Sequence, residues 1–315
     1  MKSKASAPGK IILFGEHFVV YGTKAILCAI NKRITVTAEK TYDSKIAIKS
    51  SIGNLVLEPK IPINEINISL RPFYFLADMM IQKYNETTGI KITIDSEIPL
   101  GVGLGSSSAC CVASAAAISG VFEKRSREEI LQMAIEAEKT IFPNTSGADC
   151  TVCTYGGLIR FDKQNGHSKI ESEPKFHLVI ANSKKEHSTK EVVSNVKKFK
   201  ETNEDHFARM CIQENDLIED VLLCLKNNDL KCIGKNLIKN QEYLETIGVS
   251  NEKLRNMIEI ATKYSLGAKI TGAGDGGCIF ALTDENNMKK TIHQLQENDV
   301  DCFSVKIDFK GLDTF

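Results

Sequence analysis

A glycine-rich run that ends in three serines is the part of this sequence that points most directly to chemistry. Residues 99–109 read PLGVGLGSSSA, and an alternating apolar segment at 90–97 precedes them. This order predicts a strand, a glycine loop and the start of a helix. Glycines let a backbone approach a ligand, and the first N–H groups of a helix have no intrahelical partner. The run therefore predicts an anion site, in which the three hydroxyls could bind phosphate or Mg²⁺.

The run does not match the common phosphate-binding signatures. The sequence has no GxxxxGK[S/T] motif, and Ser106 stands where the dinucleotide-binding pattern GxGxxG has its last glycine. Two interpretations stay open at this point. The run is either an ordinary strand-to-helix turn or a phosphate loop of another kind.

Charged side chains interrupt an apolar segment near the N-terminus. Lys10 opens the run KIILF, and Glu16 and His17 follow it after one glycine. A lysine at a strand end is usually solvated at the tip of its flexible stem. The alternative is a ligand site, because structure alone does not require these side chains there.

Two carboxylates stand out in the middle of the chain. Asp149 ends the segment NTSGAD (144–149), where it could simply cap a turn. Glu138 shares a predicted helical stripe with Leu131, Ala134 and Ile135, and a carboxylate on an apolar stripe needs a partner. A salt bridge is one partner. The other is Mg²⁺, which takes one or two carboxylates together with phosphate oxygens.

A second glycine-rich run, KITGAGDGGC, covers residues 269–278 and matches GxGxxG literally. The pattern requires a helix after the loop, whereas the residues that follow, CIFAL (278–282), read as a strand. We therefore interpret it either as a tight hairpin or as a loop that packs against a phosphate site. A Rossmann-type oxidoreductase is disfavoured by the same context.

Composition limits the class of protein. The chain has 315 residues, of which 42% are hydrophobic, and equal numbers of Lys plus Arg and Asp plus Glu, 40 each. Because these charges balance, the protein has no net positive charge that would attract nucleic acid or an anionic membrane. The apolar stretch 109–122 is too short to cross a bilayer. Ten cysteines without a secretory signal predict reduced, buried thiols and a cytoplasmic location.

Periodicity predicts an α+β fold with two domains, 1–168 and 169–315, divided near the polar segment DKQNGHSK (162–169). A capping box at Ser126 and Glu129 opens a predicted helix to about residue 142. Further helices are expected at 72–88, 190–226, 230–246 and 251–264. Strands are expected at 33–40, 90–97, 176–181, near 268 and 279, and at 302–309.

Three of these segments together resemble the GHMP kinase family. Residues 7–17, 99–109 and 269–278 are similar to its three motifs and occur in the same order. The segments GEHFVVYG (15–22), NTSGAD (144–149), NQ (240–241) and GVS (248–250) resemble the family members that phosphorylate mevalonate. The resemblance implies an N-terminal domain like the second domain of ribosomal protein S5 and a C-terminal ferredoxin-like α/β sandwich.

The resemblance also implies an activity, with ATP as co-substrate and Mg²⁺ as cofactor. The expected reaction is phosphorylation of the 5-hydroxyl of mevalonate, in isoprenoid biosynthesis, by a cytoplasmic protein expected to form a homodimer. By position, Asp149 is the expected base, Lys10 stabilises the transferred phosphoryl group, and Ser107 and Glu138 bind Mg²⁺. The expected ATP-binding residues are Pro99, Gly101, Gly103, Leu104, Gly105, Ser106, Ser107, Ser108 and Ala109. The expected mevalonate-binding residues are Glu16, His17, Asp149, Thr189, Gly272, Ala273 and Gly274.

Other functions remain as alternatives. A related kinase acting on the mevalonate 3-hydroxyl, phosphomevalonate, homoserine or pantoate would share the ATP loops and differ at the acceptor site. A decarboxylase of the same family is disfavoured because both Lys10 and Glu138 are present. A non-catalytic sensor of ATP and a metabolite is disfavoured because the lysine, aspartate and glutamate are all retained. The one departure from the expected motifs is Asp275, where mevalonate-phosphorylating members commonly have glycine.

Overall fold

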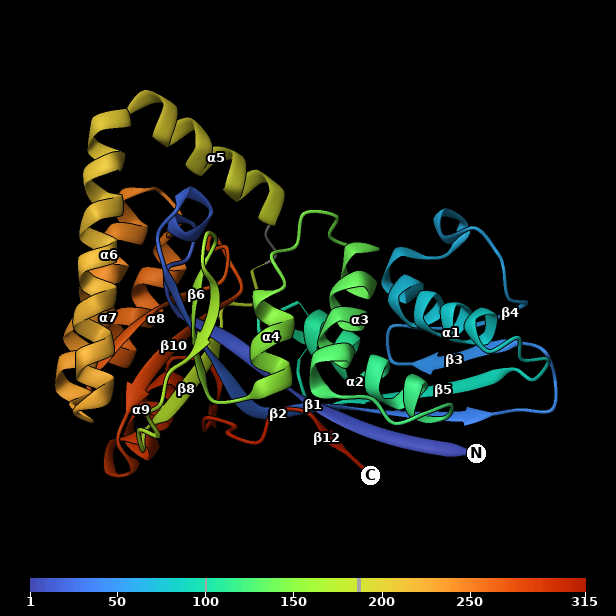
Figure 1. Cartoon of the computed structure of the whole chain (residues 1–315). Helices are drawn as coiled ribbons and strands as arrows, with labels where there is room; N and C mark the ends of the chain where they lie inside the picture. The colour runs from blue at the N-terminus through green and yellow to red at the C-terminus, as the bar shows by residue number, and fades with distance from the viewer. Residues whose placement is uncertain (100, 186–187) are drawn as a thin grey trace.

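The computed structural model describes residues 1–99, 101–185 and 188–315. Figure 1 shows two halves, each with a sheet and its own helices, side by side. The strands of the first sheet are β1 (Lys2–Phe14), β2 (Ala25–Lys40), β3 (Ile46–Ser50), β4 (Gly53–Leu57), β5 (Ile90–Ser96), β6 (Leu158–Asp162), β7 (Gly166–Lys169) and β12 (Asp313–Thr314). Their order is β12-β1-β2-β5-β3-β4, with β6 pairing with both β2 and β7.

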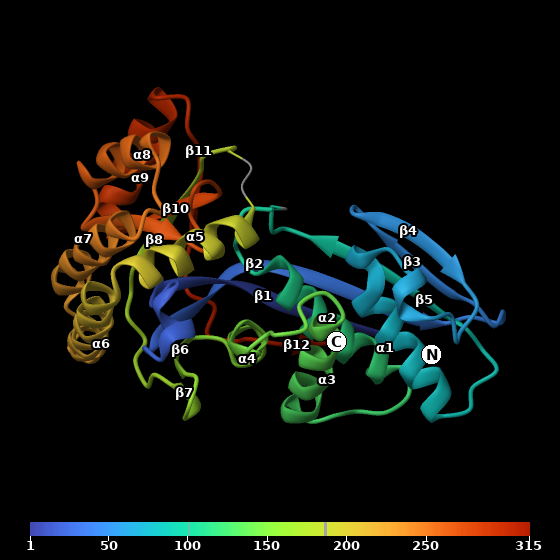
Figure 2. The same cartoon turned by 90° about the horizontal axis from the view of Figure 1, so that it is seen from above.

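Four helices lie together against the first sheet, as Figure 2 shows from above. The central one, α2 (Ser106–Gly120), is made almost entirely of small and apolar residues, so it can pack closely against β1, β2 and its neighbouring helices. The predicted capping box of α3 is confirmed at Ser126 and Glu129. The other helices of this half are α1 (Arg71–Lys83), α3 (Arg127–Lys139) and α4 (Ala148–Tyr155), and a 3₁₀ turn, η1 (Phe18–Tyr21), follows β1.

The second sheet is antiparallel and has the order β11-β8-β10-β9. Its strands are β8 (His177–Asn182), β9 (Gly267–Thr271), β10 (Cys278–Thr283) and β11 (Asp301–Val305). The helices of this half are α5 (Thr189–Thr202), α6 (Glu204–Lys226), α7 (Leu230–Thr246), α8 (Glu252–Thr262) and α9 (Glu285–Glu297). The predicted mixture of helices and strands in both halves is confirmed.

Three strands of the second sheet, β8, β9 and β10, are buried on both faces, whereas most of β11 is only half-buried. Along β8, Leu178 and Ile180 belong to a core that continues into the first half, whereas Val179 and Ala181 belong to a separate core. This alternation follows from the two-residue period of a strand. One apolar core therefore spans both halves and holds them together.

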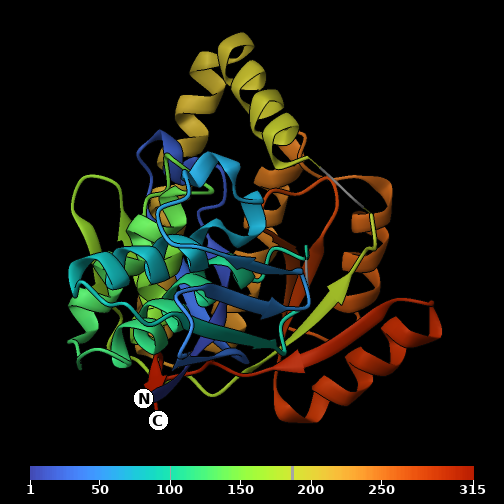
Figure 3. The same cartoon turned by 90° about the vertical axis from the view of Figure 1, so that its right-hand side faces the viewer.

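The last residues of the chain return to the first half. We expected a strand over 302–309, and this is wrong beyond Val305, because Ile307 bridges to Ile30 and β12 pairs with β1. The N–H of Phe315 accordingly donates to the carbonyl oxygen of Lys4 on β1, and Figure 3 shows both termini at the lower edge of the molecule.

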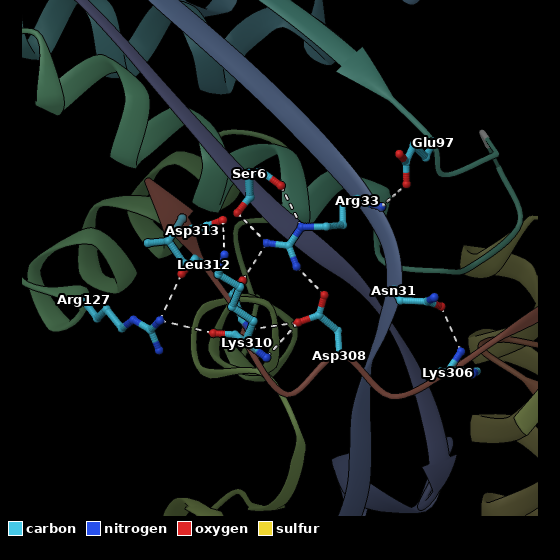
Figure 4. A network of polar contacts seen from close by, with 11 residues as sticks. Ser6, Asn31, Arg33, Glu97, Arg127, Lys306, Asp308, Lys310, Leu312 and Asp313 are labelled. Carbon is cyan, nitrogen blue, oxygen red and sulfur yellow. Dashed lines mark hydrogen bonds and ion pairs between the residues drawn. The ribbon is translucent and has the colours of Figure 1, made fainter. Parts of the chain in front are cut away.

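An arginine fastens this returning segment (Figure 4). The Arg33 guanidinium donates to the carboxylate of Asp308, to the carbonyl oxygen of Gly311 at 2.6 Å and to the hydroxyl of Ser6 at 2.7 Å. Arg127 adds hydrogen bonds to two carbonyl oxygens farther along the segment. We call residues 306–315 the C-terminal strap.

Candidate active site

A lysine and an aspartate from opposite ends of the first half meet at the centre of the site. Lys10 Nζ on β1 lies 3.0 Å from Asp149 Oδ2, in the first turn of α4. The Lys10 side chain is 6% exposed and that of Asp149 36% exposed. Burial alone would lower the pKa of Lys10, but the charge and hydrogen bond of Asp149 outweigh it and raise the pKa. Lys10 is therefore a fixed cation beside a carboxylate that solvent reaches.

The first glycine loop is built around this lysine. Gly101, Gly103 and Gly105 all have φ between 71° and 78°, the left-handed region that glycine adopts without strain. A Cβ on Gly105 would lie 2.6 Å from Cγ of Lys10, and the Lys10 N–H donates to the Leu104 carbonyl at 2.9 Å. The loop and the lysine consequently occupy fixed relative positions.

Helix α2 begins directly after this loop. Gly105 is its N-cap and has no side chain with which to satisfy the first N–H groups of the helix. These groups lie next to the Lys10 cation, which is the environment that a phosphate chain requires. Of the predicted ATP-binding residues, Pro99, Gly101 and Gly103 are exposed, Gly105, Ser106 and Ser107 are half-buried, and Leu104, Ser108 and Ala109 are buried.

The predicted magnesium ligands, Ser107 and Glu138, lie in the same region of the site. The Glu138 carboxylate is buried and accepts hydrogen bonds from Ser108 and, at 2.5 Å, from Thr145. The expectation that Ser107 and Glu138 bind the same Mg²⁺ ion stays a prediction. Within the described parts of the chain, the buried Ser107 hydroxyl has no hydrogen-bond partner. An unsatisfied buried hydroxyl of this kind fits a metal or phosphate contact.

Electrostatics also favour a cation near Glu138. Burial raises the pKa of Glu138, the nearby charge of Asp149 raises it further, and the hydrogen bonds from Ser108 and Thr145 oppose both effects. Two carboxylates near one another repel, and a divalent cation would relieve the repulsion. Among the described residues there is no group of three or more His, Cys, Asp or Glu that could hold a metal without phosphate or hydroxyl ligands.

The second glycine-rich run closes the other side of the site. It is a hairpin loop between β9 and β10, so the rejection of a dinucleotide-binding helix is confirmed. An ideal Cβ on Gly103 would lie 3.9 Å from the Thr271 carbonyl oxygen, so the two glycine loops face each other. Gly272 and Ala273 are half-buried in this loop, and Gly274 is buried. Asp275 is held by Lys185 at 2.7 Å and by Asn251 at 3.2 Å.

His17 bridges from the first half to this hairpin loop. Its Nε2 lies 2.8 Å from the Ala273 carbonyl oxygen, and because a carbonyl only accepts, Nε2 carries the proton. Burial lowers the pKa of His17, which keeps the imidazole neutral with Nδ1 as an acceptor. The predicted residue Thr189 lies exposed at the start of α5, and its place in the site stays a prediction.

Sequence reasoning missed a buried polar cluster directly behind Glu16. Lys269 pairs with Glu16, and Glu214 binds Asn240, with all four side chains no more than 1% exposed. The signal was present: Glu214 shares a helical stripe with apolar neighbours in α6, as Glu138 does in α3. The same rule, that a carboxylate on an apolar stripe needs a partner, would have found it.

The cysteines follow the expectation only in part. Cys224 and Cys232, at the facing ends of α6 and α7, form a disulfide with Cα atoms 5.9 Å apart, so the expectation of ten reduced thiols is wrong for this pair. Antiparallel helices joined by a short turn bring residues eight apart into reach, which spacing alone did not reveal. The other eight cysteines are free.

In the described part of the chain, no helix combines the length and the apolar composition needed to cross a membrane.

Comparison with known proteins agrees with this geometry. Residues 72–157 match the family described as GHMP kinases N terminal domain, and residues 221–301 match GHMP kinases C terminal. The mevalonate kinase of Thermococcus onnurineus is 35% identical over 311 residues, covering 90% of each chain. That of Archaeoglobus fulgidus is 35% identical over 280 residues, covering 88% of this chain and 91% of the relative.

Solved structures agree as well. The crystal structure of the Methanococcus jannaschii mevalonate kinase superposes with a TM-score of 0.86 at 29% identity, covering 97% of this chain and 98% of that one. The predicted two-domain GHMP kinase fold is confirmed. The chain belongs to the GHMP kinase family, in the group whose curated members are mevalonate kinases.

Proposed function

We propose that this chain transfers the γ-phosphoryl group of ATP to the 5-hydroxyl of mevalonate, giving 5-phosphomevalonate and ADP. The observation that carries the proposal is the Lys10–Asp149 pair, which lies beside a glycine loop and an open helix N-terminus. The curated mevalonate kinases, 35% identical over most of the chain, supply the substrate class.

The chain's own groups account for the positioning of ATP. Loop amides and the first N–H groups of α2 would bind the phosphate chain, and the Lys10 ammonium would stabilise negative charge on the group in transfer. Ser107 and Glu138 would hold Mg²⁺, which when bound neutralises charge on the triphosphate. The unpartnered hydroxyl of Ser107 supports this assignment.

Asp149 is the proposed base. A hydroxyl that attacks phosphorus becomes acidic as the new bond forms, so a weakly basic carboxylate within hydrogen-bond reach can accept its proton. The 36% exposure of the Asp149 side chain leaves room for an incoming hydroxyl. The Lys10 ammonium, 3.0 Å away, would neutralise charge on the other reactant.

The acceptor side of the site is formed by both halves of the chain. Glu16 and His17 come from the turn after β1, and Gly272, Ala273 and Gly274 come from the β9–β10 hairpin loop. We include Thr189 as a further hydroxyl from α5. A cytoplasmic homodimer is part of the proposal and rests on the family resemblance alone.

The test measures ADP release with Mg²⁺-ATP and mevalonate, mevalonate 5-phosphate, homoserine or pantoate, with Asp149→Asn as control. Phosphorus NMR then locates the phosphate on the product. Turnover with mevalonate that gives the 5-phosphate and is lost in the variant is expected. Turnover with another alcohol would move the acceptor assignment to a related kinase, and ATP binding without turnover would indicate a sensor.

A further inference from the structure

The turn that follows β1, residues 15–17, is held by separate elements of the second half. The Gly15 N–H lies close enough to the carboxylate of Glu214 on α6 to stabilise its charged form. The Glu16 carboxylate pairs with the ammonium of Lys269 on β9. Each of these contacts crosses from the first half of the chain to the second.

The next two residues are anchored in the same way. His17 donates to the Ala273 carbonyl of the hairpin loop, 2.8 Å away. Phe18 stacks on Phe207 of α6, with ring centroids 5.6 Å apart, and belongs to the core of the second half. Figure 1 shows this blue segment beside the helices of the second half. Four consecutive residues therefore take their positions from α6, β9 and the hairpin loop.

The backbone of the turn needs such anchors. His17 has φ of 62° and ψ of −47°, which a residue with a side chain adopts only under strain. Gly15 has φ of 97°, and a Cβ there would lie 2.5 Å from the Lys24 carbonyl oxygen. A strained conformation persists only where its surroundings fix it, and such strain concentrates at ligand sites.

The anchors themselves are sealed from water. Lys269 and Glu214 are 0% exposed, and Asn240 Nδ2 lies 2.8 and 2.7 Å from the two carboxylate oxygens of Glu214. The Lys269 ammonium pairs with Glu16 and also attracts the charge of Glu214, to which the Asn240 amide donates. Burying such a cluster is costly unless every contact is kept.

We propose that Glu214 and Lys269 are positioning residues for the acceptor substrate, which hold the 15–17 turn from behind, through Glu16, so that His17 faces the bound alcohol. This inference rests on the proposed function and deepens it. Neither residue touches the Lys10–Asp149 pair through a contact that we find in the described structure, so their effect reaches substrate through the turn. The neutral His17, with Nδ1 free to accept, suits a hydroxyl of the substrate better than its carboxylate.

The test compares Glu214→Ala with Glu214→Gln in the full-length protein. The alanine removes the acceptor of the Asn240 amide and the oxygen that faces the Gly15 N–H, whereas the glutamine retains a carbonyl oxygen in its place. We expect the alanine variant to raise KM for mevalonate about fivefold or more, with KM for ATP changed less than about twofold. The glutamine variant should return KM for mevalonate to within about twofold of wild type. Lys269→Met, which fills the volume of the lysine stem, provides a second and independent variant.

The readout separates positioning from stability. A substitution that only destabilises the fold lowers the folded fraction, and with it the apparent kcat, but leaves KM unchanged. Arg33→Met, at the partly buried contact between β2 and the C-terminal strap, is the control and should lower stability without changing KM for mevalonate. Wild-type KM for mevalonate in both folded variants, Glu214→Ala and Lys269→Met, would overturn the inference. Absence of mevalonate turnover in the wild type would instead overturn the proposed function.

Discussion

Two buried lysines on neighbouring strands, each paired with a carboxylate, serve different purposes in this molecule. Lys10 on β1 pairs with Asp149, and Lys269 on β9 pairs with Glu16. The first pair opens to solvent on its carboxylate side, which is 36% exposed, whereas the second is sealed, at 0% and 1% exposed. Both pairs join a lysine to a carboxylate, and they differ in whether solvent reaches the carboxylate.

Access changes the electrostatics of each lysine. For Lys10, the charge of Asp149 outweighs burial and raises the pKa. For Lys269, burial outweighs the attraction of Glu16 and lowers the pKa, while burial raises that of Glu16. The open pair can act on a substrate, whereas the sealed pair fixes the chain around it. In this molecule, the buried lysine that is a catalytic candidate is the one whose carboxylate partner is open to solvent and substrate.

Asp149→Asn tests the open pair and carries the largest expected effect. The amide cannot accept the hydroxyl proton, so we expect kcat to fall by about 10² to 10⁴. Binding of ATP and mevalonate should persist, because the shape of the site is retained. Calorimetric titration alongside steady-state kinetics checks both points. Turnover close to wild type would remove Asp149 from the role of base.

Lys269→Met tests how much the sealed pair contributes to the stability of the protein. Leaving Glu16 buried without its cation should lower the free energy of unfolding by about 3 to 5 kcal/mol. Lys10→Met should cost less stability, because Asp149 stays hydrated, yet it should lose far more kcat. Urea unfolding and kinetics on the two variants measure the contrast. Equal losses of stability would contradict the distinction between open and sealed pairs.

Glu214→Gln tests how protonation of the sealed cluster affects stability. Burial, with the charge of Glu16 adding to it, raises the pKa of Glu214 from 4.5 to about 7. The folded state therefore binds more protons than the unfolded state between these values, so this group makes stability fall as pH rises from about 4.5 to 7. The neutral glutamine removes that loss, and the variant should be stabilised by up to about 3 kcal/mol at pH 8 and by less at pH 5.

Urea unfolding at both pH values measures the effect of Glu214→Gln. Glu219→Gln is the control, because Glu219 lies on the same helix, is 51% exposed and pairs with Lys24 at the surface. It should change stability little at either pH. If the free energy of unfolding changed equally in Glu214→Gln and Glu219→Gln, the stabilisation would not result from the burial of Glu214.

Glu138→Gln has the smallest expected effect and concerns the environment of the open pair. Loss of one carboxylate ligand should raise the Mg²⁺ concentration needed for half-maximal activity, by about tenfold for a loss of 1.4 kcal/mol. The ATP concentration is kept constant while Mg²⁺ is titrated. A titration that superposes on that of the wild type would exclude Glu138 as a ligand.

The local features of the fold could be read from the sequence because they depend on neighbouring residues. The Ser126 capping box, the strand at 90–97 and the hairpin at 272–277 all follow from short-range patterns. The return of the strap to β1 could not be predicted, since it depends on the three-dimensional position of Ile30 and Arg33. A pattern that reads as a strand does not state which sheet the strand will join.

The candidate site likewise has some features that the sequence predicts and others that depend on the three-dimensional packing. Lys10 and Asp149 were identified from motifs, and the structure brings them to 3.0 Å. The choice of Ser108 as the partner of Glu138 depends on the rotation of α2 about its axis, which sequence spacing leaves open. Glu214 could have been found from its apolar stripe in α6, whereas the pairing of Lys269 with Glu16, 253 residues away, depends on the packing of the two halves.

The C-terminal strap also sets an order of events during synthesis. Arg33 and its partner Asp308 are 275 residues apart, so at about 5 to 20 residues per second the ribosome makes the arginine some tens of seconds before its carboxylate. Until then one edge of β1 lacks its β12 neighbour and presents unpaired backbone groups. The first sheet can begin to form early, but it is completed only after residues 313 and 314 leave the ribosome. A nascent chain stalled before residue 308 would thus carry an open sheet edge, which chaperones are suited to cover.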